Sequence, residues 1–517
     1  MRLSDCTERQ QGHHRPFPGM PVLDPREFEK MGESPFEAIS LRQLAGSLPG
    51  RLLGIGLLVV LSGNSPRVQA HSLQTGLPKE YRSHAKENLL GDMGGFREWL
   101  YRYGVSLNIQ SDDELWVNAQ GGTRQHEAYE GIGTIQIGID PEKLTGIKGG
   151  WFNVSWLNIR GRSITQDRLA DYNPISGYEA YRSNRLLELW YQQGFWNGRL
   201  NVKVGQQALD NEFLLSDYAN LFLNSNFGWP MAPSINLYAG GPSWPLASLG
   251  ARVSYQPTDQ LSWLFAVADD NPPGHSFYNA NDPTNQSVHP HGDNFNLGGG
   301  ALFINEFQYS INPQPDNLSD DSPDPGLPGT YKIGGIYDTG QFADQRYDKD
   351  GKPLASPDST GTPKEHRGNW ILYAVMDQMV WRPSLSSPTS VGVFARITDN
   401  RSDRNVVDFA ADAGFNLNAP FESRTYDAFG IGWGMGHTGK QAREADRDAR
   451  SYSNDYYPIR QNEHHIEVTY KAQVTPWFFV QPDFQYIYHP GGGGLNEKND
   501  HRAHNEMLFG VHTRVVL

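Results

Sequence analysis

The segment Glu463–His489 reads EHHIEVTYKAQVTPWFFVQPDFQYIYH and decides the fold class. Apolar or aromatic residues occupy every second position from Ile466 to Val474, and polar residues fill the positions between them. After Thr475-Pro476 the alternation resumes, and it returns in Met507–Leu517 at the end of the chain. A period of two indicates β-strands with one apolar and one polar face.

Two architectures fit such strands. A soluble antiparallel sheet places one face on a core and the other in water. A transmembrane β-barrel has strands of about ten residues, apolar toward the lipid and polar toward the lumen. The alternating runs here are longer than the five to six residues that are typical of soluble strands. Their length therefore favours the barrel.

The composition agrees with this interpretation. The chain has 517 residues, a formal net charge of −14 and a mean hydropathy of −0.59. A low mean hydropathy is compatible with a barrel, since half of each strand is polar. The acidic balance argues against nucleic acid as a partner. Cys6 is the single cysteine, so no internal disulfide can form.

The N-terminal region has the three parts of an export signal. Arg42 and Arg51 precede the apolar run 52–61, and the small-residue sequence Val68-Gln69-Ala70 follows. This order predicts a secretory signal cleaved after Ala70. We therefore expect three parts: an extension with a signal at 1–70, a periplasmic segment with a short helix at 71–104, and an outer-membrane barrel at 105–517.

The same alternation along the chain predicts sixteen strands in all. Besides the last three, they are expected at 105–117, 132–140, 151–160, 185–194, 200–204, 249–256, 261–269, 297–311, 330–340, 369–381, 391–398, 407–417 and 427–436. Short and long links alternate, and outer-membrane barrels have short periplasmic turns and long external loops. The links 161–184, 207–248, 270–296, 341–368, 437–462 and 489–504 are the long ones. The weak run 407–417 is included because an even count keeps both termini in the periplasm.

Two blocks of sequence resemble a known family. The first is Leu89-Leu90-Gly91-Asp92-Met93-Gly94-Gly95-Phe96-Arg97, and the second is Gln481-Pro482-Asp483-Phe484-Gln485-Tyr486. Together they resemble the OprB-type carbohydrate-selective porins over residues 89–517. The resemblance implies a sixteen-stranded outer-membrane barrel that admits glucose-like sugars by passive diffusion, with no cofactor. The chain departs from the family at Met93, where Trp is usual, and at Leu517, where barrels usually end in an aromatic residue.

Selectivity in a porin comes from size, hydrogen bonding and charge along the pore. Strand parity assigns a set of polar or aromatic side chains to the inner wall: Glu188, Trp190, Lys203, Arg252, Glu306, Lys332, Asp338, Arg396, Glu467, Lys471, Asp483, Gln485 and Arg514. Any wide barrel has a polar wall of mixed charge, so parity identifies the wall and not the constriction. Asp483 and Gln485 could instead bond strands or loops.

The link 207–248 is rich in Asn, Pro and aromatic residues, and it is predicted to fold inward as the constriction. Its candidate residues are Asp210, Glu212, Asp217, Asn224, Asn226 and Trp229. An external lid is the alternative for this loop.

A general porin, a polysaccharide barrel and an enzyme are the alternatives to the sugar channel. A general porin differs only in its transport behaviour, and a barrel that passes or binds polysaccharide should carry wall charges of one sign. No Gly-x-Ser-x-Gly, Walker or His-Glu-x-x-His motif supports an enzyme, and no metal site is indicated. The expected partners are small sugars, outer-membrane lipid and lipopolysaccharide, and a homo-oligomer is compatible with the sequence.

Overall fold

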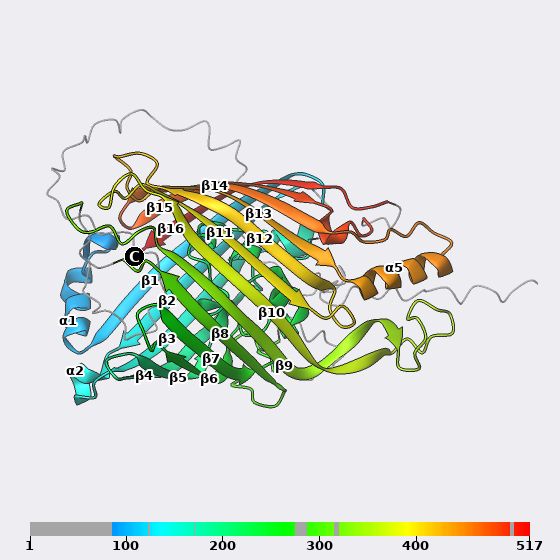
Figure 1. Cartoon of the computed structure of the whole chain (residues 1–517), viewed down its shortest axis with the longest axis horizontal. Helices are drawn as coiled ribbons and strands as arrows, with labels where there is room; N and C mark the ends of the chain where they lie inside the picture. The colour runs from blue at the N-terminus through cyan, green and yellow to red at the C-terminus, as the bar shows by residue number, and fades with distance from the viewer. Residues whose placement is uncertain are drawn as a thin grey trace, which may run out of the picture. The chain divides into compact units, whose positions relative to one another are not determined.

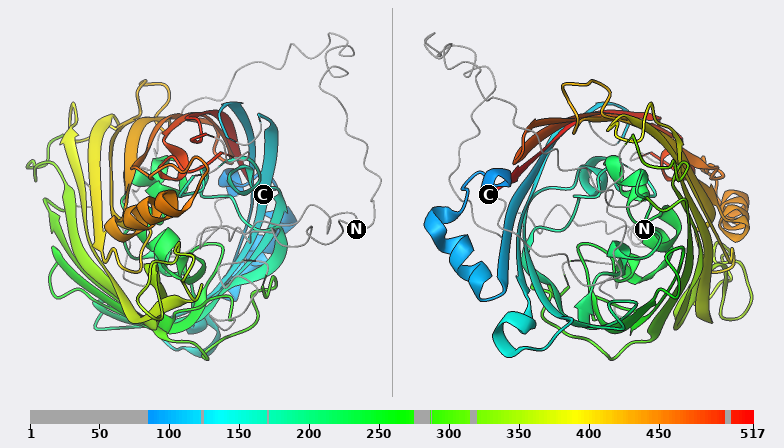
Figure 2. Two further views of the ribbon diagram at one scale, coloured as in Figure 1. Left: turned by 90° about the vertical axis from the view of Figure 1, so that its right-hand side faces the viewer. Right: turned by 60° about the vertical axis from the view of Figure 1, so that its left-hand side comes forward.

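The computed structural model describes residues 85–122, 125–169, 171–274, 286, 288–314, 320–496 and 501–517. The predicted signal at 1–70 and residues 71–84 lie outside the described residues. Sixteen antiparallel strands form one closed barrel in which every strand pairs with its neighbours in sequence and β1 pairs with β16 (Figures 1 and 2). The prediction of a sixteen-stranded barrel is confirmed, including the weak run at β12.

The strand bounds are as follows: β1 Val105–Gln120, β2 Glu127–Ile139, β3 Gly150–Gly161, β4 Ser183–Phe195, β5 Leu200–Gln207, β6 Ser248–Tyr255, β7 Leu261–Asp269, β8 Ala301–Ile311, β9 Gly329–Asp348, β10 Pro363–Trp381, β11 Ser390–Asn400, β12 Val407–Asn418, β13 Ala428–Thr438, β14 Glu463–Thr475, β15 Phe478–Tyr488 and β16 Glu506–Val516. The prediction of a long link at 341–368 is wrong. β9 and β10 continue past the neighbouring strands as a paired hairpin, and only residues 349–362 connect them.

The helices are short and lie in the connections. They are α1 Phe96–Arg102, α2 Pro141–Thr145, α3 Ile164–Arg168, α4 Met231–Asn236 and α5 Lys440–Tyr452, with 3₁₀ turns η2 Ala85–Glu87, η3 Met93–Gly95, η4 Leu209–Asn211, η5 Ala219–Leu221, η6 Ser225–Phe227, η7 Tyr238–Gly240 and η8 Pro490–Gly492. Among the described residues, no helix is long and apolar enough to cross a bilayer.

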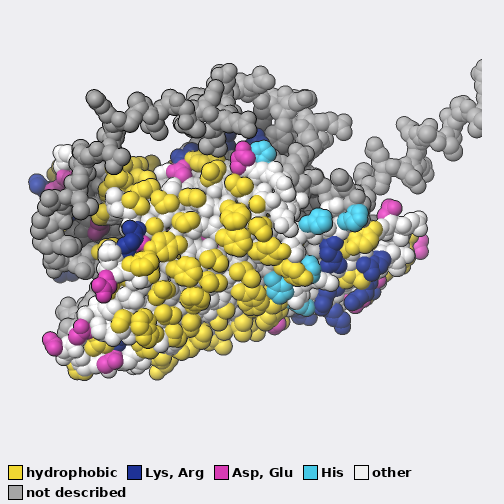
Figure 3. Space-filling model, turned by 90° about the horizontal axis from the view of Figure 1, so that it is seen from above, with side chains coloured by type: hydrophobic (Ala, Val, Ile, Leu, Met, Phe, Trp, Pro, Cys, Tyr) yellow, Lys and Arg dark blue, Asp and Glu magenta, His cyan; other side chains and the backbone are white. Residues whose placement is uncertain are grey.

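The outer face of the barrel is apolar. Side chains such as Val204, Ile333 and Leu372 are more than half exposed although they are aliphatic. Hydrophobic side chains cover the barrel wall in Figure 3. An exposed belt of this kind matches a lipid-facing surface. It arises directly from the period-two pattern, since every second residue of each strand points outward.

The first family-like block packs beside the end of the barrel where β1 begins and β16 ends. Gly94 and Gly95 have positive φ angles of 68° and 92°, which turn the chain into α1. The buried guanidinium of Arg97 donates to the carbonyl of Gly91 at 2.6 Å and to the carbonyl of Leu517 at 2.5 Å. The short helix expected within 71–104 is present as α1, and its Arg97 ties Leu517, just past the end of β16, to the N-terminal segment.

Candidate functional site: the inward loops and the barrel wall

The connection between β5 and β6, residues 208–247, folds into the barrel. Figure 2 shows its short helices inside the ring of strands. Leu209, Phe213 and Leu214 of this inward loop pack with inner residues of β7–β10, including Ile304 and Ile371, in one buried apolar cluster. The prediction that this loop turns inward is confirmed. Part of the inner face of β7–β10 is therefore apolar, as the outer face is, because the loop packs against it.

The first polar anchor of the loop is Glu212. Its carboxylate forms ion pairs with Lys203 on β5 and with Arg252 on β6, the latter at 2.5 Å, and all three residues are buried. Burial opposes ionisation of Glu212, but Arg252 and Lys203 outweigh it and hold the pKa of this carboxyl at about 2. The Lys203 ammonium also lies 4.9 Å from the ring centre of Trp190. These predicted wall and loop residues therefore form one structural cluster.

The second anchor binds the backbone of Leu214 and Leu215. The carboxylate of Glu306 accepts the Leu214 N–H at 2.9 Å, and the Lys332 ammonium donates to the Leu215 carbonyl at 2.7 Å. Arg396 donates to the carbonyls of Leu214, Asn226 and Gly228. Side chains from three different strands thus fix the same part of the loop.

The third anchor involves the second family-like block. Glu467 accepts the N–H groups of Leu223 at 2.6 Å and Asn224 at 2.9 Å. The Asn224 side chain donates to Gln485 at 2.9 Å, and Gln485 in turn donates to Asp483 at 3.2 Å. Gln481 donates to the carbonyl of Leu221 at 2.8 Å. The block therefore positions the loop, as the loop-bonding alternative for Asp483 and Gln485 expects.

A stripe of glycines on β13 brings the loop close to the wall. Gly430, Gly432, Gly434 and Gly436 occupy the inner positions of the strand. A Cβ atom on Gly432 would lie 2.6 Å from the ring of Phe227, and one on Gly430 would lie 2.8 Å from Phe222. Any side chain at these positions would displace the loop. In the sequence, glycine at every second position of β13 is the signal for this contact, which was not predicted.

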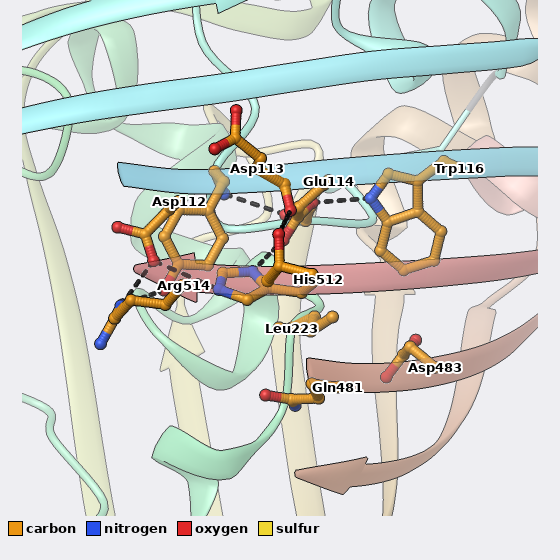
Figure 4. Close-up of polar contacts among 12 residues, drawn as sticks. Asp112, Asp113, Glu114, Trp116, Leu223, Gln481, Asp483, His512 and Arg514 are labelled. Atoms are coloured by element: carbon orange, nitrogen blue, oxygen red, sulfur yellow. Dashed lines mark hydrogen bonds and ion pairs between the residues drawn. The ribbon is translucent and has the colours of Figure 1, made fainter. Parts of the chain in front are cut away.

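A second connection, residues 162–182, reaches the seam between β1 and β16. His512 lies between Glu114, with an Nδ1–Oε1 distance of 2.7 Å, and Asp112, with an Nε2–Oδ1 distance of 3.2 Å (Figure 4). Arg514 pairs with Asp112 at 2.6 Å and donates to the Tyr178 hydroxyl at 2.7 Å. This network couples the closing strands to the second inward loop. Parity correctly placed Arg514 inside but gave no sign of the partners.

The remaining predicted residues serve several contacts. The Glu188 carboxylate accepts the Ala208 N–H at 3.2 Å where the inward loop begins. Asp210 accepts the Trp244 N–H at 2.9 Å, and Trp229 donates to the Gly240 carbonyl at 2.8 Å, so both stabilise the loop itself. Lys471 lies apart, with its ammonium 4.7 Å from the ring centre of Phe479. Further inner and loop residues with such contacts are Asp338, Asp217 and Asn226.

The inner face of β1 and β2 is left open toward the lumen at its periplasmic half. Asn108 pairs with Gln136 in the register of these strands, and Gln110 pairs with Thr134. These side chains point inward, since their neighbours Ile109 and Ile135 belong to the outer belt, and all four are half-buried. With Ser106 they form a strip of uncharged amides and hydroxyls, which we call the neutral strip. Strand parity also assigns these side chains to the inner wall, although they were not among the predicted candidates, most of which are charged.

Among the described residues, no group of three or more His, Cys, Asp or Glu side chains is arranged to hold a metal ion. His464 and His465 point to opposite faces of β14, because the first is half-buried on the outside and the second is buried inside.

Comparison with known proteins agrees with this architecture. The model of the family described as "Carbohydrate-selective porin, OprB family" matches residues 124–517. Porin B of Pseudomonas aeruginosa is 28% identical over 431 residues, covering 78% of this chain and 87% of that protein. The putative porin QuiX of Acinetobacter baylyi is 24% identical over 443 residues, covering 81% and 92%. The high-pH structure of Pseudomonas putida OprB has a TM-score of 0.69 at 23% identity, covering 85% of this chain and all of that one. The chain thus belongs to the OprB family of carbohydrate-selective porins, which are channels of the outer membrane.

Proposed function

We propose that this protein lets glucose-like sugars diffuse passively through the space between the inward loops and the neutral strip. The observation that supports the proposal is the division of the inner wall. Charged side chains of β5, β6, β8, β9, β11 and β14 are occupied in holding the loop, whereas the stretch of β1 and β2 that forms the neutral strip presents amides and hydroxyls. In the closed ring, β1 and β2 lie opposite β9 and β10.

This division suits an uncharged polyhydroxylated solute. A sugar loses hydrogen bonds to water when it enters a narrow pore, and side-chain amides can replace them because each has both donor and acceptor groups. A small ion gains less from such a wall, since its desolvation cost is much larger than that of a neutral solute. We expect Asn108, Gln136 and Ser106 to form the hydrogen-bonding side of the path. Trp190 and Lys471 remain half-buried candidates for further contacts.

The partners follow from the two faces of the barrel. We propose that the outer belt contacts lipid and lipopolysaccharide, and that the function is transport without catalysis. A homo-oligomer is compatible with the barrel. A general porin is the alternative, because the same barrel without a preference for sugars would pass all small solutes. A barrel that passes or binds polysaccharide is a weaker alternative, since the wall contains both Glu and Arg anchors rather than one sign of charge.

Solute flux into liposomes containing the purified protein tests the proposal. Glucose is compared with amino acids of equal size and with salts, and maltodextrins of increasing length serve as blockers. Faster glucose influx that longer maltodextrins inhibit is the expected result. Equal influx of all small solutes would establish a general porin, and no flux through a folded barrel would favour the polysaccharide or receptor function.

A further inference from the structure

A basic pocket lies on the outside of the barrel, at the external ends of β13–β16 and beside α5. Its volume is about 610 Å³. The arginines that line it are Arg443, Arg447, Arg450, Arg460 and Arg502. His464, Tyr488 and His489 complete the wall together with uncharged residues, and none of the lining residues is acidic. Figure 3 shows Lys and Arg side chains gathered with His at this end, next to the hydrophobic belt.

The sequence of α5 produces this basic face. Arg443, Arg447 and Arg450 are spaced four and three residues apart, which places them within an arc of roughly 60° on one side of the helix. Two of its three acidic residues point elsewhere. Glu444 and Asp448 face Arg346 on β9, where the Arg346–Asp448 distance is 2.6 Å. The helix is therefore held by its acidic side, and its basic side is left for another partner.

Three of the arginines have no carboxylate partner within the described part of the chain: Arg443, Arg450 and Arg502. Arg460 is matched by Asp446 at 2.9 Å, and Arg447 pairs with Glu444. The Nε atom of Arg443 and one guanidinium nitrogen of Arg502 are shielded from solvent and have no hydrogen-bond acceptor among the described residues. A shielded guanidinium nitrogen without an acceptor is costly, so an anionic ligand would stabilise it.

The position of the pocket identifies the source of that anion. His464 and Tyr488 belong to the outer, lipid-facing sides of β14 and β15, and Tyr488 is 46% exposed. The ring of His464 stacks on Trp433, with centroids 6.0 Å apart, at the external edge of the apolar belt. A lipid whose acyl chains lie on the belt would place its headgroup at the arginines. We propose that this pocket binds the phosphate groups of an outer-leaflet lipid.

The experiment uses the full-length barrel purified in detergent and native mass spectrometry with two probes. One probe is lipid A with both phosphates, and the other is the same lipid without phosphates. We expect the phosphorylated lipid to bind about tenfold or more tightly. The triple substitution Arg443→Gln, Arg447→Gln and Arg450→Gln should abolish the difference. Arg502→Gln tests the same pocket without changing the helix.

The matched control removes three exposed positive charges from the β9–β10 hairpin, by Lys349→Gln, Lys364→Gln and Arg367→Gln, and should leave binding unchanged. Equal binding of both lipids, or equal loss in the control, would overturn the proposal. Inorganic pyrophosphate distinguishes the source of the anion. If it raises the thermal stability of the barrel as much as lipid A does, the pocket is a site for soluble anions and the lipid proposal is wrong. Sugar flux is measured in parallel, because binding of lipid outside the barrel is independent of the proposed transport.

Discussion

Asp412 on β12 lies 2.9 Å from the Nε atom of Arg396 on β11, and both side chains are almost completely buried. The pair links two neighbouring strands, and the other nitrogens of Arg396 reach three carbonyls of the inward loop. One side chain therefore joins the barrel wall to the inward loop. Its loss should affect both stability and transport.

Replacing Arg396 with Gln leaves the Asp412 carboxylate buried without a counter-charge. We expect a loss of roughly 3–5 kcal/mol in the free energy of unfolding, which is typical when one partner of a buried ion pair is removed. Urea unfolding of the refolded barrel measures it. Arg199→Gln is the matched control, since Arg199 forms an exposed pair with Asp259 at 3.5 Å and should cost less than about 1 kcal/mol. Equal effects of the two substitutions would refute the anchoring role.

Replacing Gly432 with Val tests the close contact between β13 and the loop. The new side chain would overlap the ring of Phe227, so we expect the loop to move and the single-channel conductance to change by roughly twofold. Gly133→Val is the control, because the nearest atom to a Cβ there is 3.6 Å away and the position faces outward. An unchanged conductance in Gly432→Val would show that the loop does not limit the pore.

The double substitution Asn108→Asp and Gln136→Glu tests whether the neutral strip lines the path. Two negative charges on a pore wall attract cations, so we expect a roughly twofold rise in the permeability of cations relative to anions. Reversal potentials in a salt gradient measure this ratio. Asn454→Asp adds a negative charge on an external loop and should leave the ratio near its original value. A strip that lies outside the path would give no shift in either variant.

Asp210 should make stability depend on pH. Burial and the charge of Glu188 raise the pKa of this carboxyl to about 7. The hydrogen bond from the Trp244 N–H favours the ionised form and opposes this rise, but it is the smaller effect. The folded state thus keeps the proton at pH values where the unfolded state loses it. The stabilisation is complete below the unfolded pKa and is lost as pH rises through 7.

In the Asp210→Asn variant this pH dependence should be absent. Relative to the original protein, the variant should gain about 4 kcal/mol in the free energy of unfolding at pH 8.5 and almost nothing at pH 4. Urea unfolding at a series of pH values gives the difference. A gain that is the same at every pH would show that the carboxyl does not titrate in this range.

The strands could be predicted from the sequence because their cause is local. Each strand has one apolar outer face, so apolar residues such as Ile466, Val468 and Tyr470 recur at every second position. The inner positions of the wall followed from the same parity. The continuation of β9 and β10 beyond their neighbours was not predicted, because nothing local in the sequence distinguishes a paired hairpin from a loop.

The division of the wall could not be predicted in the same way. Whether Glu467 faces water or the Asn224 N–H depends on the path of a loop more than two hundred residues earlier in the chain. Two signals did exist. The alternate glycines of β13 indicate a close neighbour, and the apolar residues Leu264 and Ala266 at inner positions of β7 indicate burial on both faces. Both become informative only when the loop is known to fold inward.

The contact between Arg97 and the carbonyl of Leu517 has a practical consequence. Leu517 is half-buried next to α1, so an affinity tag fused after it would begin at the guanidinium of Arg97 and crowd the junction of β1 and β16. A tag inserted between β9 and β10 at the exposed residues Lys349 and Asp350, where the hairpin extends beyond the neighbouring strands, avoids this cost. The C-terminus of this barrel is thus a structural part of the wall rather than a free handle.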